Sequence, residues 1–193
     1  MKKIFAFPLI ATSALALAAC GEAATDTAAP AAGETAEAGA AITAEEVAAA
    51  QKAWGEGIVN IGKVSTDGGD VSAAAQEHIN KFYAYEDGET VLFKPTLAAQ
   101  DQFRGSFDEA LSYFIGTEGT EDGGFAIKPW TNVRWENEGT IVDGDSAMAM
   151  GNYYFTDTDG NDTKVEYTFG YTKNDAGEVV ITLHHSSVPY SAS

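Results

Sequence analysis

Apolar side chains in the first half of the chain recur every three or four residues, which is the spacing of a helix with one buried face. The first such stretch follows Thr43-Ala44-Glu45-Glu46, a capping box that pairs free backbone groups at a helix start. Its apolar positions are Val47, Ala50, Trp54, Ile58 and Ile61. Gly62 is a suitable end for this helix. The same reasoning predicts helices over residues 70–83 and 106–116, the second again opened by a capping box.

From Trp130 onward the apolar positions alternate with polar ones, which is the spacing of a β-strand with one buried face. We expect four strands here and one short earlier strand, at about 130–142, 145–156, 163–173, 178–187 and 90–94. Turns rich in Asp, Asn and Gly separate the four later strands. Helices followed by an antiparallel meander predict an α+β domain. In it, a cone-shaped, curved antiparallel sheet wraps around the N-terminal helices and encloses a pocket.

The last predicted strand brings polar side chains to this pocket. The apolar residues on its core-facing side are Val179, Ile181 and Leu183. Continued alternation places His185 and Ser187 on the inner face, and His184 and Ser186 on the outer face. Buried polar groups need partners, so an imidazole and a hydroxyl at the end of an apolar stripe favour a pocket floor. A single inward histidine is more often a packed core residue, but Ser187 beside it shifts the balance towards a site.

The first residues of the chain have the three parts of a signal peptide. Lys2 and Lys3 form a positive start, residues 4–17 are mostly apolar, and small residues follow. The run Leu17-Ala18-Ala19-Cys20 resembles the lipobox of bacterial lipoproteins, in which the cysteine thiol is acylated before cleavage. Cys20 is the only cysteine in the chain, so the predicted domain has no disulfide. The alternative is an ordinary secretory signal with an incidental cysteine.

The sequence therefore predicts three parts: a signal peptide over 1–19, an acylated Cys20 with a disordered tether over 20–41, and one α+β catalytic domain over 42–193. The tether contains only small or polar residues and cannot bury enough apolar area to fold. We expect an exported protein that is lipid-anchored to the bacterial cell envelope and faces the periplasm. Gly21 after the cysteine slightly favours the outer membrane by resemblance to bacterial sorting patterns.

The charge of the chain limits its partners. It has 193 residues, with 29 acidic against 11 basic ones and a formal net charge of −18. Such a surface argues against nucleic acid and against anionic lipid, so we expect membrane contact through the lipid anchor only.

The sequence offers little for a metal site. The three histidines are His78, His184 and His185, and the adjacent pair is predicted to point to opposite faces, which argues against a histidine-rich zinc site within one chain. Residues 157–162 resemble the start of a calcium loop, but Thr168 occupies the position that needs glutamate, which favours a hairpin turn. The chain has no G-x-S-x-G sequence, no P-loop and no dinucleotide fingerprint.

Six short segments carry a resemblance to a known family. They are VLFKPT (91–96), ALSYFIG (110–116), EDGGFAIKPW (121–130), AMAMGNYYF (147–155), KVEYTFGY (164–171) and LHHSSVP (183–189). In this order they resemble the iota class of carbonic anhydrases, over about residues 43–190. That class is built on the association domain of calmodulin-dependent protein kinase II, in the nuclear transport factor 2-like superfamily. The resemblance implies reversible hydration of carbon dioxide to bicarbonate, and a homodimer.

The resemblance also implies a site made of hydroxyls and an imidazole. Thr96, Tyr113 and Ser187 would bind the bicarbonate oxygens and stabilise the developing negative charge. His185 would orient the attacking water or relay its proton. The implied site holds no metal, although some members of the class have been described as metal-dependent, so zinc or manganese stays open.

Two other functions fit the same fold, because this superfamily carries many activities on one scaffold. The first is a non-enzymatic association or small-ligand-binding module, which would tolerate changes at Ser187 and Tyr113. The second is another acid–base enzyme of the superfamily, with His185 as the general base and a deeper pocket for a larger substrate.

Overall fold

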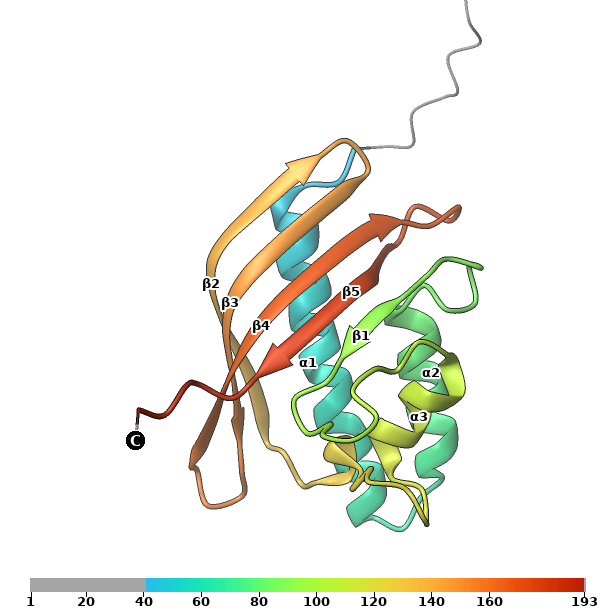
Figure 1. The fold of residues 1–193 in the computed structure, drawn as a ribbon, viewed down its shortest axis with the longest axis vertical. Helices are drawn as coiled ribbons and strands as arrows, with labels where there is room; N and C mark the ends of the chain where they lie inside the picture. The colour runs from blue at the N-terminus through green and yellow to red at the C-terminus, as the bar shows by residue number, and fades with distance from the viewer. Residues whose placement is uncertain (1–40, 193) are drawn as a thin grey trace, which may run out of the picture. The chain divides into compact units, whose positions relative to one another are not determined.

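The computed structural model describes residues 41–192, and Figure 1 shows their fold. The predicted signal peptide, Cys20 and the tether up to residue 40 lie outside the described residues. The elements, in chain order, are α1 (Ala44–Thr66), α2 (Val71–Phe82), β1 (Leu92–Lys94), α3 (Phe107–Ile115), the 3-10 helix η1 (Phe125–Ile127), β2 (Asn132–Asp143), β3 (Ser146–Thr156), β4 (Asp162–Lys173) and β5 (Val179–Ser187).

The helices begin at the predicted caps. The Thr43 hydroxyl accepts a hydrogen bond from the backbone N–H of Glu46 at 3.1 Å, and the Glu46 carboxylate accepts one from the Thr43 N–H at 2.8 Å. Ser106 and Glu109 form the same reciprocal capping box at the start of α3, and Asp70 caps α2. These local hydrogen bonds confirm the predicted helix starts.

The predicted end of α1 at Gly62 is wrong, because the helix continues to Thr66. A side chain at Gly62 would overlap the carbonyl oxygen of Lys128, in the segment that follows η1. Gly62 therefore permits a close approach of two backbones instead of ending the helix.

The sheet has five strands in the order β1-β5-β4-β3-β2. Strands β2 to β5 form the predicted antiparallel meander, and β1 joins its edge parallel to β5. Figure 1 shows the sheet curving around α1, with α2 and α3 beside the β1 edge. The fold is the predicted α+β arrangement of N-terminal helices against a curved sheet.

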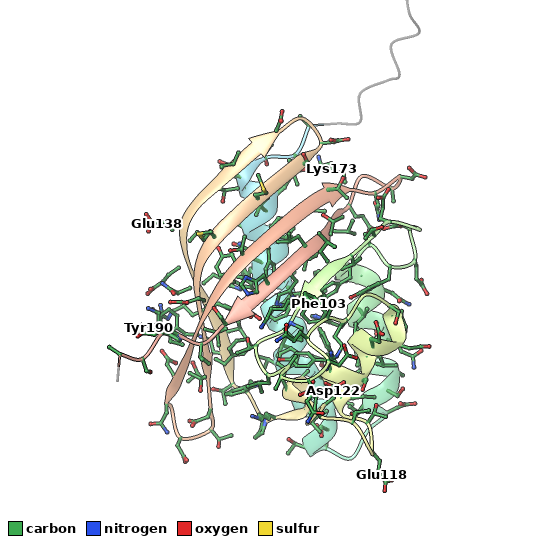
Figure 2. The ribbon with its side chains drawn as sticks, in the orientation of Figure 1. Phe103, Glu118, Asp122, Glu138, Lys173 and Tyr190 are labelled. Carbon is green, nitrogen blue, oxygen red and sulfur yellow. The ribbon has the colours of Figure 1, made fainter. Side chains whose placement is uncertain are left out.

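Aromatic rings fill the space between the sheet and the helices (Figure 2). Trp54 of α1 lies at the centre and is 1% exposed. Its ring centroid lies 5.7 Å from that of Trp135 on β2 and 6.1 Å from that of Phe169 on β4. The inner face of β4 is formed by alternating buried side chains, which are Val165, Tyr167, Phe169 and Tyr171. Aromatic burial of this extent supplies most of the packing energy of a domain this size.

A β-bulge in β5 changes which side chains face inward. Gly170 and Tyr171 are adjacent on β4, but their partners on β5 are Leu183 and Ile181, so Thr182 is an extra residue. An extra residue reverses the alternation of every side chain beyond it. Ile181 is buried as predicted, whereas Leu183 lies on the outer face beside Leu92 and Met148.

Candidate functional site

A small cavity of about 160 Å³ lies at one end of the inner sheet face. The segment after β1, helix α3, the region of η1 and strands β3 to β5 all contribute to its wall. Its apolar lining residues are Leu97, Phe125, Trp130, Phe155, Val165 and Val188. Its polar lining residues are Thr96, Tyr113, Lys128, Tyr153, Thr163, His184 and Ser186. A cavity well below the size of drug-binding pockets suits a ligand of only a few atoms.

Hydroxyl groups from four elements converge on this cavity. Thr96 Oγ1 donates a hydrogen bond to Ser186 Oγ at 2.8 Å. The Tyr113 hydroxyl accepts a hydrogen bond from the Leu97 N–H at 3.3 Å, which leaves its own proton available for a ligand. Burial raises the pKa of Tyr113 to about 12, so the phenol stays protonated at neutral pH.

Tyr153 of β3 adds a further neutral hydroxyl. Burial raises the pKa of Tyr153, and the nearby hydroxyls of Ser186 and Thr96 act in the opposite direction. The cavity therefore holds several hydroxyl donors and no ionised phenol.

His184 lines the cavity as a neutral imidazole. It is 2% exposed, and burial lowers its pKa well below the usual range, with a smaller contribution from the adjacent His185. Its Nδ1 lies 2.8 Å from the hydroxyl of Tyr83, which itself accepts a hydrogen bond from Trp54 Nε1 at 3.1 Å. If Tyr83 donates its single proton to Nδ1, both protons in this series of hydrogen bonds from Trp54 to His184 have an acceptor. The remaining His184 proton then lies on Nε2.

The Nε2 atom of His184 is buried and has no hydrogen-bond partner among residues 41–192. A buried donor without a partner loses stabilisation of about 1–3 kcal/mol. Among the unpartnered buried side-chain atoms of residues 41–192, Nε2 of His184 is the one whose residue lines this cavity. A ligand oxygen in the cavity would supply that partner.

The structure brings together two of the four catalytic residues that the sequence predicts. Thr96 and Tyr113 line the cavity. The inward orientation predicted for His185 and Ser187 is wrong: His185 is exposed, and Ser187 donates a hydrogen bond to Glu166 at 3.3 Å. The bulge at Thr182 is the physical reason, since it places His184 and Ser186 inward instead.

Sequence reasoning missed five polar residues that line the cavity, namely Lys128, Tyr153, Thr163, His184 and Ser186. Strict alternation along β5 hides the last two, because a bulge leaves no clear signal in one sequence. Tyr153 shares the inner face of β3 with Phe155, so alternation along that strand could have found it.

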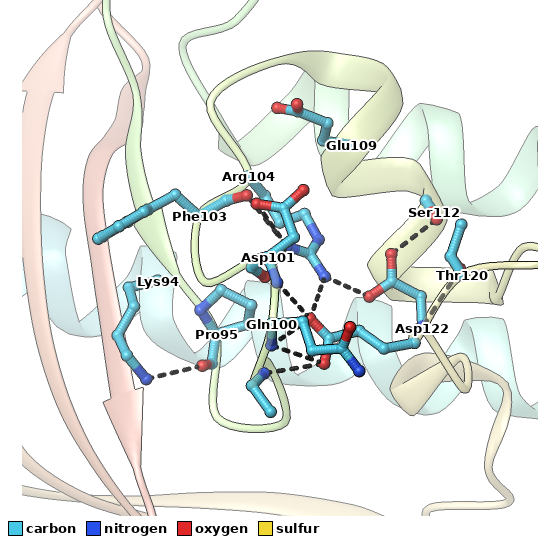
Figure 3. A network of polar contacts seen from close by, with 12 residues as sticks. Lys94, Pro95, Gln100, Asp101, Phe103, Arg104, Glu109, Ser112, Thr120 and Asp122 are labelled. Atoms are coloured by element: carbon cyan, nitrogen blue, oxygen red, sulfur yellow. Dashed lines mark hydrogen bonds and ion pairs between the residues drawn. The ribbon is translucent and has the colours of Figure 1, made fainter.

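A network of polar contacts holds the segment that carries Thr96 (Figure 3). Arg104, whose side chain is 3% exposed, pairs with Asp122 and donates a hydrogen bond to the carbonyl oxygen of Asp101 at 2.6 Å. Asp122 in turn accepts a hydrogen bond from Ser112 at 2.7 Å, next to Tyr113 on α3. The network therefore ties the segment after β1 to the helix that supplies Tyr113.

Glu121 completes this support. Its carboxylate accepts hydrogen bonds from the backbone N–H groups of residues 99, 100 and 101, at 2.8–3.1 Å. These N–H groups lower the pKa of Glu121, together with the nearby Arg104. Hydrogen bonds to a charged carboxylate are strong, so Glu121 holds residues 99–101 in place and thereby fixes the segment that carries Thr96.

Within residues 41–192, no group of three or more His, Cys, Asp or Glu side chains is placed to hold a metal ion. In the same range, no helix has the length and apolar character needed to cross a membrane.

Comparison with known proteins gives one family. The family model described as metal-independent carbonic anhydrase matches residues 45–188. The chain is 43% identical to a metal-independent carbonic anhydrase from Nostoc sp. over 150 residues, which are 75% of this chain and 73% of the relative.

Solved structures agree. The crystal structure of a cyanobacterial iota-carbonic anhydrase complexed with bicarbonate matches with a TM-score of 0.75 and 40% identity, over 79% of this chain and 95% of the other. A candidate calcium/calmodulin-dependent protein kinase II association domain from Xanthomonas campestris matches with a TM-score of 0.52 and 24% identity, over 78% and 91% of the two chains. The second likeness concerns the fold alone.

Proposed function

This chain belongs to the metal-independent carbonic anhydrase family and is a carbonic anhydrase; on that basis we propose that it hydrates carbon dioxide in the cavity lined by Thr96, Tyr113, His184 and Ser186. Family membership favours this enzyme over the binding module and the other acid–base enzymes considered above. The observation that carries the proposal is the convergence of neutral hydroxyls and one unpartnered imidazole nitrogen, Nε2 of His184, on a cavity of about 160 Å³.

The hydroxyls suit the charge that develops during hydration. As the water oxygen bonds to the carbon of carbon dioxide, negative charge grows on the two original oxygens. Tyr113 and the Nε2–H of His184 would donate hydrogen bonds to those oxygens in a water-poor cavity, where such donors are most effective. The apolar wall accommodates carbon dioxide itself, which has no strong hydrogen-bonding group.

A proton must leave the attacking water, and burial holds the two phenols and the imidazole neutral. We therefore propose a relay through the hydrogen-bonded pair Thr96 and Ser186. Thr96 accepts a proton from the water and passes its own proton along the hydrogen bond to Ser186, which gives its proton to an oxygen of carbon dioxide. Both hydroxyls are neutral again at the end of the step. The product is carbonic acid, which loses its acidic proton to solvent and leaves as bicarbonate. The relay needs no metal-bound hydroxide and no ionised base.

Stopped-flow measurement of carbon dioxide hydration tests the site, on purified protein after exhaustive chelation and with metal content determined on the same sample. Ser186→Ala should lower kcat by about 10²–10³-fold, which is typical for the loss of one donor to a developing oxyanion. Ser187→Ala is the matched control, because its hydroxyl lies on the outer face, and it should keep the activity. Full activity in Ser186→Ala would remove this residue from the site.

We also propose that the protein is a lipoprotein of the bacterial cell envelope, facing the periplasm. The support is the signal-like start and the lipobox-like run that ends at Cys20. Two or more acyl chains on one residue give stable anchoring. Expression with a labelled fatty acid should label the wild type and leave Cys20→Ser unlabelled. Equal labelling of the two proteins would contradict the proposal.

The outer face of the sheet supports a homodimer, which we also propose. One row of paired positions crosses all five strands, and its members are Ile141, Met148, Gly170, Leu183 and Leu92. Ile141 is 64% exposed and Met148 56% exposed. A continuous apolar row on an open sheet face is typical of a surface that another chain covers. A second copy can cover it by two-fold symmetry, because the row is the same on both subunits.

Sedimentation of the purified protein tests this arrangement. The wild type should sediment as a dimer, and Met148→Glu should shift it to monomer by burying a charge in the interface. Tyr190→Glu is the control, since Tyr190 is exposed in the C-terminal tail that follows β5 and does not belong to the sheet row (Figure 2). A monomeric wild type, or a dimer that survives Met148→Glu, would contradict the proposed interface.

A further inference from the structure

Lys128 lies at the wall of the cavity, and its backbone and side chain are held there by several contacts. It directly follows η1, and its carbonyl oxygen accepts a hydrogen bond from the Trp130 N–H at 2.8 Å. Gly62 of α1 leaves room for that same carbonyl. The ammonium group of Lys128 lies 5.8 Å from the centre of the Trp130 ring, within reach of a cation–π interaction. These contacts keep an exposed lysine beside the cavity.

The Trp130 ring is itself held in place. Its Nε1 donates a hydrogen bond to the carbonyl oxygen of Phe125 at 2.9 Å, and the ring centroid lies 5.3 Å from that of Phe155. Both Phe125 and Phe155 line the cavity together with Trp130. The surface under the lysine ammonium is therefore a fixed part of the cavity wall.

The charge of Lys128 stands out in its surroundings. The chain as a whole carries a formal charge of −18. Among the residues that line the cavity, Lys128 alone carries a formal charge, because the phenols and His184 are neutral. In the part of the chain that the structure describes, Lys128 forms no ion pair within 4.0 Å. Its positive charge is thus available to a ligand.

Carbon dioxide and bicarbonate, the substrates of the two directions of the proposed reaction, differ in charge. Carbon dioxide is neutral and can approach an acidic protein without electrostatic work, whereas bicarbonate is an anion that such a protein repels. We infer that Lys128 attracts bicarbonate to the cavity and contributes to its binding, as a specificity-determining residue at the entrance. This inference rests on the proposed function, because it assigns the anion to the same cavity.

The effect has a defined kinetic signature. The equilibrium between carbon dioxide and bicarbonate does not depend on the enzyme, so the kcat/KM values in the two directions must change by the same factor. The equilibrium places no such constraint on the affinity of the enzyme for bicarbonate. It is measured directly as the inhibition constant of added bicarbonate in the hydration direction, at low ionic strength where charge effects are largest.

Lys128→Gln tests the inference, because it removes the charge and keeps much of the length of the side chain. We expect the inhibition constant for bicarbonate to rise roughly three- to tenfold, as for one charge near a partly solvated anion. The dependence of that constant on salt should become weaker. Lys128→Arg, which keeps the charge, should restore both properties.

Lys164→Gln is the matched control. Lys164 lies on β4 between Thr163 and Val165, both of which line the cavity, but it does not line the cavity itself. The change alters the net charge of the chain by the same amount as Lys128→Gln. We expect the inhibition constant for bicarbonate to stay at the wild-type value.

Two outcomes would overturn the inference: an unchanged inhibition constant in Lys128→Gln, or an equal rise in Lys164→Gln. The second would assign the effect to net charge alone. Failure of the proposed function looks different, since it would appear as a wild-type protein without hydration activity or as a fully active Ser186→Ala variant.

Discussion

Two groups of polar side chains lie next to each other on the inner face of the sheet, and they use their hydrogen bonds differently. Gln51, Asn137 and Tyr167 form a closed ring: Gln51 donates to Tyr167 at 3.1 Å, Tyr167 donates to Asn137 at 2.6 Å, and Asn137 donates to Gln51 at 2.7 Å. Tyr167 is the direct strand partner of Ser186. Around Ser186 and His184, by contrast, donors remain available towards a cavity.

The difference separates stability from function among residues of similar type. A closed ring satisfies its own members, so its net contribution is to folding and to a unique packing of the core. The open group keeps donors that the fold leaves unpartnered, as a ligand site requires. Polar burial alone would not have distinguished the two, since Gln51 and Ser186 are each 2% exposed.

The largest expected effect comes from removing one tyrosine hydroxyl from each of the two groups. Tyr113→Phe should lower kcat for hydration by about 10²–10³-fold, because it removes a donor to the developing charge. Its melting temperature should stay close to the wild type. Tyr167→Phe should do the reverse, with a free energy of unfolding lower by about 1–3 kcal/mol and an unchanged kcat, because it opens the closed ring. Stopped-flow kinetics and thermal unfolding check both variants, and equal effects on kcat would contradict the comparison.

A smaller effect is expected at Tyr83, which acts through His184. Tyr83→Phe removes the donor to Nδ1, so the His184 proton is no longer directed to Nε2. We expect kcat to fall by about tenfold, as for a weakened hydrogen-bond donor.

Nitrogen NMR shifts of the His184 ring report the tautomer independently of activity. Tyr85→Phe is the control, because the Tyr85 hydroxyl donates to the carbonyl oxygen of Arg104 and not to a histidine. An unchanged tautomer together with an unchanged kcat would show that Tyr83 does not position His184.

Lowering the pH should have the smallest effect on catalysis. It should lower the free energy of unfolding instead. Burial lowers the pKa of His78 to about 3 and that of His184 well below the usual range. The unfolded chain therefore binds more protons than the folded one below about pH 6.5, and each histidine lowers the free energy of unfolding by about 1.4 kcal/mol per pH unit there. This stability is present above pH 6.5 and is lost on acidification.

The variant His78→Leu separates the contributions of His78 and His184 to the pH dependence of stability. Between about pH 6 and pH 4 it should reduce the slope of stability against pH by one proton, measured by denaturant unfolding at several pH values. Its hydration activity should be kept, because His78 does not line the cavity. An unchanged slope would mean that His78 is not held neutral by the fold.

The sequence predicts the elements of this fold well and the details of the site only in part. Capping boxes, helical spacing and strand alternation are local signals, and they located the helix starts and the strands of the meander. The parallel pairing of β1 with β5 depends on long-range packing, which no local pattern encodes. Thr96 and Tyr113 came from the family resemblance and line the cavity.

The two residues that the sequence placed wrongly show the limit of alternation. His185 and Ser187 would face inward on a regular strand, but one unpaired residue, Thr182, reverses the pattern. A bulge is decided by the fit of the whole sheet around the core and not by the residues of one strand. A pattern of period two is therefore reliable only up to the first such irregularity.

The bulge in β5 has a consequence for how this strand tolerates a shift in its pairing with β4. The strand carries its functional side chains in duplicate, as His184-His185 followed by Ser186-Ser187. If Thr182 paired regularly with β4 and the bulge were lost, the alternation beyond it would reverse and turn His185 and Ser187 towards the cavity. An imidazole and a hydroxyl two positions apart would face inward in either frame. The duplicated sequence thus preserves the chemical character of this wall when the pairing of the strand shifts by one residue.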